Sequence, residues 1–130
     1  MDPDDAKMAQ ECGANAIVVS NHGGRQLDGV NSSISTLPEI KKAVSNMDVL
    51  MDGGISSGQD ILKAIALGAE GVMIGRSFVY GLSAKGKEGV INALEILNKE
   101  LDMTMALCGR RDIKDVNRAI IKDCPFFEKN

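Results

Sequence analysis

The only histidine of this chain lies in a polar, glycine-containing loop that directly follows a short apolar segment. Residues 17–19 are apolar and β-branched, which predicts a buried strand. His22 can accept a proton near neutral pH, and Arg25, three residues later, carries a planar guanidinium that suits a carboxylate or a phosphate. Gly23 and Gly24 allow the backbone to turn sharply and to approach a flat ligand closely. For an isolated pair, a core histidine and a surface arginine beside an ordinary turn remain the commoner explanation.

Two further glycine-containing loops follow the next two predicted strands. Asp52, Gly53 and Gly54 end the second strand, and Gly75 and Arg76 end the third. Because the carboxyl ends of parallel strands meet at one edge of a sheet, the backbone N–H groups of both loops can form a phosphate cradle. Arg76 offers a bidentate donor to the same anion. Glycines that only allow tight turns explain either loop alone, but two such loops on adjacent strands favour a phosphate site, as after strands seven and eight of a (β/α)₈ barrel.

Predicted strands and helices alternate along the chain, with short loops between them. Apolar runs predict strands at residues 16–20, 48–52 and 72–74. Apolar spacing and capping residues predict helices near residues 2–12, 36–45, 59–67, 77–82, 88–101, 104–107 and 113–121. Such alternation predicts an α/β fold with right-handed crossovers and a parallel sheet, whose carboxyl edge carries the polar loops.

The composition is that of an ordinary globular domain of 130 residues, with 44% hydrophobic and 25% charged residues. The formal net charge of −3, without a basic run, argues against nucleic acid as a partner. No apolar run reaches the roughly 20 residues needed to cross a bilayer, and no signal peptide opens the chain. Cys12, Cys108 and Cys124 lack the spacing of a disulfide framework or a metal site, so they are predicted to be small apolar fillers in a cytoplasmic protein.

Nine consecutive residues around the histidine carry a family resemblance. Residues 20–28, Ser-Asn-His-Gly-Gly-Arg-Gln-Leu-Asp, closely resemble the signature of the FMN-dependent 2-hydroxy acid dehydrogenases and oxidases, such as the L-lactate dehydrogenase and glycolate oxidase group. The resemblance implies that His22 is the catalytic base that takes the hydroxyl proton of the substrate. It also implies that Arg25 holds the substrate carboxylate.

The resemblance extends to the cofactor. Asp52, Gly53, Gly54 and Ile55 look like the family's Asp-Gly-Gly-Val/Ile segment, and Gly75 and Arg76 look like its Gly-Arg segment; both bind the phosphate and ribityl chain of FMN in the family. Ser20 matches a position that contacts the flavin. Ser56 departs from the pattern, because many relatives carry an arginine there that helps to hold FMN. A serine can still donate a hydrogen bond, but the missing charge is expected to weaken flavin binding.

The resemblance covers residues 2–121 but matches only the C-terminal portion of the family's TIM (β/α)₈ barrel, about three parallel strands. Residues 1–130 are therefore interpreted as the C-terminal part of an FMN hydroxy acid dehydrogenase domain, with a loosely held tail at 123–130. The family's tyrosines, lysine and aspartate near the flavin have no counterpart here. Tyr80, the only tyrosine, follows Arg76 in the sequence and so lies in the wrong place to match one of those tyrosines. Three strands cannot close a barrel, so we expect two unpaired sheet edges, an uncovered apolar face and a chain of doubtful stability on its own.

Three functions are compatible with these features. The first is FMN-dependent oxidation of a small 2-hydroxy acid to the 2-oxo acid, with turnover predicted to be absent in the 130-residue chain alone. The second is another phosphate-binding barrel oxidoreductase, because residues 52–81 also look somewhat like the phosphate loops of inosine monophosphate dehydrogenase. The third is a non-catalytic remnant or subunit that binds a complementing N-terminal chain, or a second copy of itself, through its open sheet edge.

Overall fold

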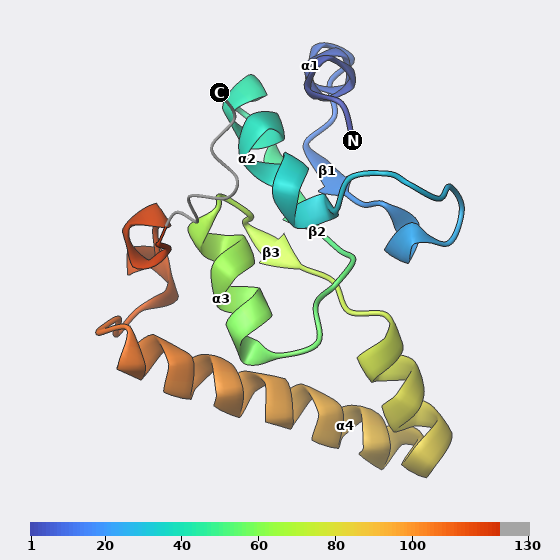
Figure 1. The fold of residues 1–130 in the computed structure, drawn as a ribbon, viewed down its shortest axis with the longest axis vertical. Helices are drawn as coiled ribbons and strands as arrows, with labels where there is room; N and C mark the ends of the chain where they lie inside the picture. The colour runs from blue at the N-terminus through green and yellow to red at the C-terminus, as the bar shows by residue number, and fades with distance from the viewer. Residues whose placement is uncertain (123–130) are drawn as a thin grey trace.

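A computed structural model describes residues 1–122 of the chain. Three parallel strands form one sheet in the order β1-β2-β3, and helices connect them (Figure 1). The elements are α1 (Pro3–Glu11), β1 (Ala16–Val19), α2 (Ser33–Ala43), β2 (Asp48–Met51), α3 (Gly58–Ala66), β3 (Gly71–Val72) and α4 (Arg76–Leu107). Single 3₁₀ turns lie at His22–Gly24, Ile113–Asp115 and Arg118–Ile120. The predicted fold class, an α/β part of a barrel with about three parallel strands, is confirmed.

One face of the sheet forms the core. Val19 pairs in register with Met51, and Met51 pairs with Val72. α2 packs against β1 and β2, and α3 packs against β3, so this face is covered by helices. Leu37 of α2 and Val49 of β2 are both 0% exposed there. β-Branched and apolar residues therefore occupy the buried side of each strand, as expected for a strand beneath crossover helices.

The opposite face of the sheet has no cover within the described part of the chain. Val18 of β1 is 45% exposed, its register partner Leu50 is half-buried, and Met73, just after β3, is 47% exposed. β1 and β3 each pair on one side only among residues 1–122. The expectation of an uncovered apolar face and two open edges is therefore confirmed for the described residues.

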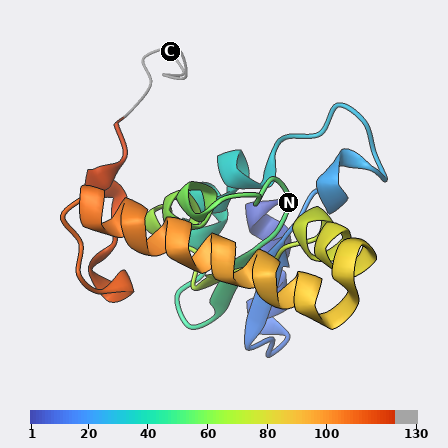
Figure 2. The same ribbon diagram turned by 90° about the horizontal axis from the view of Figure 1, so that it is seen from below.

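α4 is a helical hairpin with two arms. Its backbone leaves helical geometry at Lys85 and Gly86, and Gly86 has a positive φ of 57°. The arms touch at Gly81 and Gly89, since a Cβ added to Gly89 would lie 1.8 Å from the carbonyl oxygen of Gly81. The long arm runs along the lower end of the molecule in Figure 1, next to α3, and it crosses the front of the view from below in Figure 2. The predicted break near residues 83–87 is thus a turn within one element.

Several predicted boundaries were wrong. α2 starts at Ser33, three residues before the predicted start, and the third strand ends at Val72 instead of residue 74. The short helix predicted at 104–107 is the end of α4, because nothing interrupts the long arm before Cys108. The helix predicted at 113–121 is two separate 3₁₀ turns.

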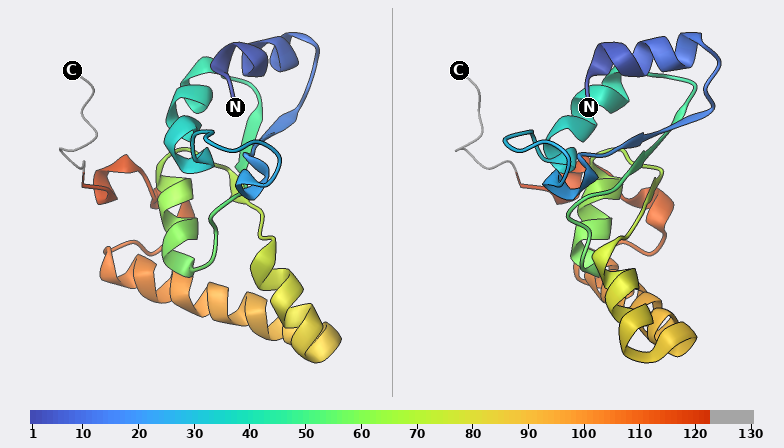
Figure 3. Two further views of the ribbon diagram at one scale, coloured as in Figure 1. Left: turned by 45° about the vertical axis from the view of Figure 1, so that its right-hand side comes forward. Right: turned by 90° about the vertical axis from the view of Figure 1, so that its right-hand side faces the viewer.

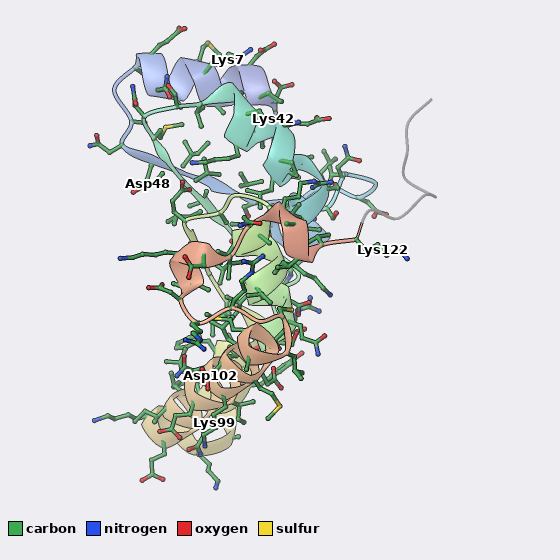
Figure 4. The ribbon with its side chains drawn as sticks, turned by 90° about the vertical axis from the view of Figure 1, so that its left-hand side faces the viewer. Lys7, Lys42, Asp48, Lys99, Asp102 and Lys122 are labelled. Atoms are coloured by element: carbon green, nitrogen blue, oxygen red, sulfur yellow. The ribbon has the colours of Figure 1, made fainter. Side chains whose placement is uncertain are left out.

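Charged side chains lie at both ends of the elongated molecule. Figure 3 shows α1 and α2 side by side at one end and the hairpin of α4 at the other. Figure 4 places Lys7 and Lys42 at the first end and Lys99 and Asp102 on α4 at the second, and all four are exposed. No helix of the described residues is long and apolar enough to span a membrane.

The predicted tail at 123–130, which includes Cys124, lies outside the described residues. The prediction that the cysteines are apolar fillers is wrong for the other two. Cys12 and Cys108 are both exposed, because they lie at the C-terminal caps of α1 and α4.

Candidate active site

The loops after the three strands meet at the carboxyl edge of the sheet. A hollow of about 420 Å³ lies there, and its lining includes Asn21 from the first loop, Gly53 and Gly54 from the second, and Arg76 after the third. Its position follows from the parallel pairing of the strands, which brings their carboxyl ends together. The two predicted glycine loops thus share one cavity in the described structure.

The loop after β2 leaves backbone donors free. Gly53 and Gly54 have φ of +84° and +82°, a conformation that favours glycine. The hydrogen bonds of the described residues leave the N–H groups of Gly53, Gly54 and Gly75 without an acceptor. A Cβ at Gly54 or Gly75 would meet no heavy atom within 4 Å, so both positions border open space. This arrangement of free donors suits an anion.

Asp52 contributes an unused acceptor beside these donors. Its own N–H donates to the carbonyl of Val19 at 3.1 Å, which fixes its backbone between β1 and β2. The Oδ1 atom is buried and has no hydrogen-bond partner among the described residues. A buried acceptor without a donor is costly, so this atom calls for a donor such as a ligand hydroxyl. A group that presents both a phosphate and hydroxyls, as FMN does, fits this loop.

The helices that begin at the two phosphate loops differ at their N-termini. In α3, the Ser57 hydroxyl accepts the N–H of Asp60, and Glu100 of α4 accepts the N–H of Gly58 at 2.8 Å. In α4, the N-cap is Gly75 and no side chain caps the helix. The N–H groups and the positive dipole end of α4 are therefore the ones still available to an anion.

Ser56, predicted to contact FMN, belongs to the capping network of α3. Its hydroxyl donates to Oδ2 of Asp60 at 3.1 Å, and its N–H donates to the same oxygen. Burial acts to raise the pKa of Asp60, but the hydrogen bonds from Ser57 and Ser56 outweigh it and hold the pKa below its usual value. Ser56 does not line the 420 Å³ hollow, whereas Arg76 does.

The predicted base lies on an exposed turn. His22 has a positive φ of 53°, which is uncommon outside glycine, and its N–H donates to the Ser20 hydroxyl at 3.1 Å. Both His22 and Ser20 line a second hollow of about 560 Å³ beside the first. Arg25 is exposed and lines neither hollow. The structure thus places His22 next to the phosphate loops through Asn21, but it does not bring the Arg25 side chain to the same cavity.

Sequence reasoning missed four polar residues at this edge. Asn21 and Ser33 contact Gly53, and Asp60 and Lys63 line the first hollow. Asn21 lies within the nine-residue motif, but the contact of its side chain with the backbone of Gly53 is a tertiary feature. Ser33 gave no signal beyond a pair of serines before a predicted helix, and Lys63 reads as an ordinary exposed helix residue. No group of three or more metal-ligating side chains occurs within residues 1–122.

Comparisons with known proteins agree on one family. The family model described as FMN-dependent dehydrogenase matches residues 1–123. The L-lactate dehydrogenase of Caulobacter vibrioides is 50% identical over 124 residues, and the 2-hydroxyacid oxidase of Dictyostelium discoideum is 51% identical over the same length. These matches cover 95% of this chain but 32% of each relative.

A solved structure of mandelate oxidase with benzoyl-formic acid is 47% identical, with a TM-score of 0.87, and the match covers 91% of this chain and 36% of that one. The chain therefore spans about a third of the length of the relatives that it matches.

Proposed function

Because the chain belongs to the FMN-dependent dehydrogenase family, we propose that it forms the C-terminal, phosphate-binding and proton-transferring part of an enzyme that oxidises a small 2-hydroxy acid to the 2-oxo acid. The observation that carries the proposal is the hollow lined by Gly53, Gly54 and Arg76, where the two glycines have free N–H groups. Asp52, directly before Gly53, adds a buried Oδ1 atom that has no partner among the described residues. The named relatives, an L-lactate dehydrogenase, a 2-hydroxyacid oxidase and a mandelate oxidase, support a 2-hydroxy acid as the substrate class.

The residues of this chain have distinct roles toward the cofactor. When bound, FMN supplies the two-electron redox chemistry, while the protein supplies binding, orientation and proton transfer. The N–H groups of Gly53, Gly54 and Gly75 would donate to its phosphate, and Arg76 would add a charged fork of donors. Asp52 would accept a hydroxyl of the cofactor through the Oδ1 atom that lacks a partner. Ser20, Ile55 and Ser56 complete the set proposed from the family pattern.

His22 and Arg25 act on the substrate in this proposal. Arg25 binds the carboxylate with its guanidinium N–H groups and so fixes the position of the α-carbon. An imidazole nitrogen of His22 then takes the hydroxyl proton, a step that a well-placed base accelerates by about 10²–10⁴-fold. Asn21 supports the placement, since it borders the phosphate loop and directly precedes His22. Arg25 must move toward the cavity from its exposed position, which a loop rich in glycine allows.

Flavin binding tests the first half of the proposal. Purified chain is mixed with FMN, and binding is followed by flavin absorbance and by quenching of flavin fluorescence. The test is repeated with the missing portion of the barrel supplied as a second chain. If FMN binds neither to the chain alone nor to the two chains together, the cofactor assignment is refuted. Lactate- or glycolate-dependent dye reduction is expected only when both portions are present; turnover by the 130-residue chain alone would overturn the predicted need for the missing residues.

A partner chain is the second part of the proposal, and a different observation favours it. The uncovered sheet face with Val18 and Met73, together with the open edges of β1 and β3, suits a complementing N-terminal barrel portion. Without that portion the chain is expected to self-associate, because both edges offer unpaired backbone groups. Sedimentation velocity over a range of concentrations checks this. A monodisperse monomer with a sharp thermal transition would contradict it.

The alternatives rank below this proposal. The family match gives no support to an inosine monophosphate dehydrogenase-like enzyme. A non-catalytic remnant predicts that flavin stays unbound even with the missing portion supplied, so the flavin measurement separates it from the enzyme. The cytoplasmic location stays a prediction from cysteine usage.

A further inference from the structure

One buried hydroxyl joins the two ends of the loop that carries His22. Ser33, the first residue of α2, is 1% exposed. Its Oγ atom accepts a hydrogen bond from the N–H of Asn21 at 3.1 Å, across 12 residues of sequence. Asn21 directly precedes His22, so the Ser33 hydroxyl fixes the backbone from which the proposed base projects.

The same cluster rests against the phosphate loop. A Cβ built on Gly53 would lie 2.8 Å from Oδ1 of Asn21 and 3.0 Å from Oγ of Ser33. Both side chains therefore pack on the main chain of Gly53. Oδ1 of Asn21 also accepts the N–H of Gly23 at 3.0 Å, and this bond carries the contact into the turn at His22–Gly24.

The loop has few other hydrogen bonds to the rest of the protein. Within the described residues, its remaining ties are bonds inside the loop, such as Asn21 Nδ2 to the carbonyl of Asn31 at 3.4 Å. Residues 22–32 are all exposed. An exposed loop with one buried tether takes its position from that tether.

We propose that Ser33 is a positioning residue, which holds the His22 turn against Gly53 and so couples the phosphate loop to the catalytic loop. The proposal rests on the proposed function for the role of His22, but the tether itself is a property of the chain without cofactor. In physical terms, Gly53, Asn21 and Ser33 are in close contact, so a ligand that fixes Gly53 also restricts Asn21. Ser33 also lines the first hollow, but in this role it acts through Asn21 and Gly53.

Amide hydrogen exchange of the full 130-residue chain, measured by NMR without cofactor, tests the tether. Ser33→Ala removes the acceptor of the Asn21 N–H. We expect exchange at Asn21 and Gly23 to accelerate on the order of fivefold, the effect of losing one ordinary hydrogen bond. The N–H of Glu70, which donates to Val49 at 3.0 Å in the sheet, serves as an internal reference for global opening and should not change.

Two comparisons separate the tether from a general loss of packing. Ser35→Ala is the matched control, because Ser35 lies in the same helical turn but is exposed, and its hydroxyl donates locally to Ser32 O at 2.7 Å. Ser33→Thr and Ser33→Val have the same shape, and only the threonine keeps the hydroxyl. Faster exchange at Asn21 in the valine variant than in the threonine variant supports the tether even if the alanine variant does not fold. Equal exchange in these two variants, or equal acceleration by Ser33→Ala and Ser35→Ala, overturns it.

A flavin titration distinguishes this proposal from the proposed function. If the exchange pattern is as expected and FMN never binds, the tether stands and the cofactor assignment fails. If FMN binds but the exchange rate at Asn21 does not depend on the Ser33 hydroxyl, the cofactor assignment stands and the positioning role is refuted.

Discussion

Gly53 and Gly54 are adjacent glycines with the same backbone conformation and different surroundings, so they form a matched pair. Both have a φ near +83°, with +84° for Gly53 and +82° for Gly54. A Cβ at Gly53 would lie 2.8 Å from Asn21 and 3.0 Å from Ser33, whereas a Cβ at Gly54 would meet nothing within 4 Å. Gly53→Ala therefore measures backbone strain and crowding together, and Gly54→Ala measures strain alone.

The expected magnitudes follow from these surroundings. An L-residue in the left-handed region costs about 1–2 kcal/mol. The reduced freedom of the unfolded chain offsets about 0.4–1 kcal/mol of that cost. Gly54→Ala should thus destabilise the protein by about 1 kcal/mol. Crowding at Gly53 adds about 1–3 kcal/mol, as for other inserted methyl groups, so Gly53→Ala should cost about 2–4 kcal/mol in total.

Urea unfolding of the cofactor-free chain measures both variants against the unchanged chain, with circular dichroism as the probe. All three proteins are compared at one low protein concentration, so that self-association does not differ between them. At a slope of about 2 kcal/mol per molar urea, Gly54→Ala should lower the midpoint by about 0.5 M and Gly53→Ala by about 1–2 M. The slopes should stay equal, since only the folded state is crowded. Equal midpoint shifts for the two variants would refute the reasoning, because they would mean that Asn21 and Ser33 do not pack on Gly53.

Three further predictions concern the candidate site. Arg76→Ala, measured in an assembly that binds FMN, should weaken flavin affinity by about ten- to a hundredfold through the loss of a charge-assisted contact worth about 1.5–3 kcal/mol; Arg111→Ala, an exposed residue outside the hollow, is the control and should change nothing. In a complete enzyme, His22→Ala should lower mainly kcat, whereas Arg25→Ala should raise KM and lower kcat, and Arg25→Lys should recover little because one ammonium cannot replace a planar fork; equal losses in all three with flavin released would mark the motif as structural. The pKa of Asp60 is lower in the folded than in the unfolded chain. The stabilising effect of the Asp60 carboxylate is therefore present above the usual pKa of an aspartate and is lost as pH falls through the folded pKa. Asp60→Asn should remove that part of the pH dependence of unfolding.

The secondary structure was largely predictable because its causes are local. The start of α1 was predicted from Asp2 and Pro3, and it matches the structure. The positions of β1 and β2 were predicted from their apolar runs, and they match as well. The early start of α2 at Ser33 was missed, because Ser32, Ser33 and Ser35 are all residues that commonly cap a helix and the sequence does not show which of them does so. In the structure the N-cap is Ser32. The two arms of α4 were predicted as separate helices, while their contact at Gly81 and Gly89 is a tertiary feature that spacing does not reveal.

The candidate site was predictable in its loops but not in its connections. The glycines of the phosphate loops stand out in the sequence because they follow apolar strands, and the family resemblance supplied roles for them. The contact between Asn21, Ser33 and Gly53 depends on how α2 packs against the sheet, so no short-range pattern encodes it. Arg25 lies in a long exposed loop, residues 22–32, and residue spacing does not predict the path of such a loop.

Phosphate binding at this edge of the sheet is expected to depend mainly on Arg76. Ser56 carries no charge, and the N-terminus of α3 that follows it is already capped. A helix that begins directly after a phosphate loop usually adds the favourable positive end of its dipole to the site. In the structure, that N-terminus is already satisfied by Ser57, Asp60 and Glu100, two of which are carboxylates that disfavour a nearby anion. The N-terminus of α4 has no side-chain cap, and it begins at Arg76. An anion at this edge is therefore attracted toward Gly75 and Arg76, where an uncapped helix end and a guanidinium act together.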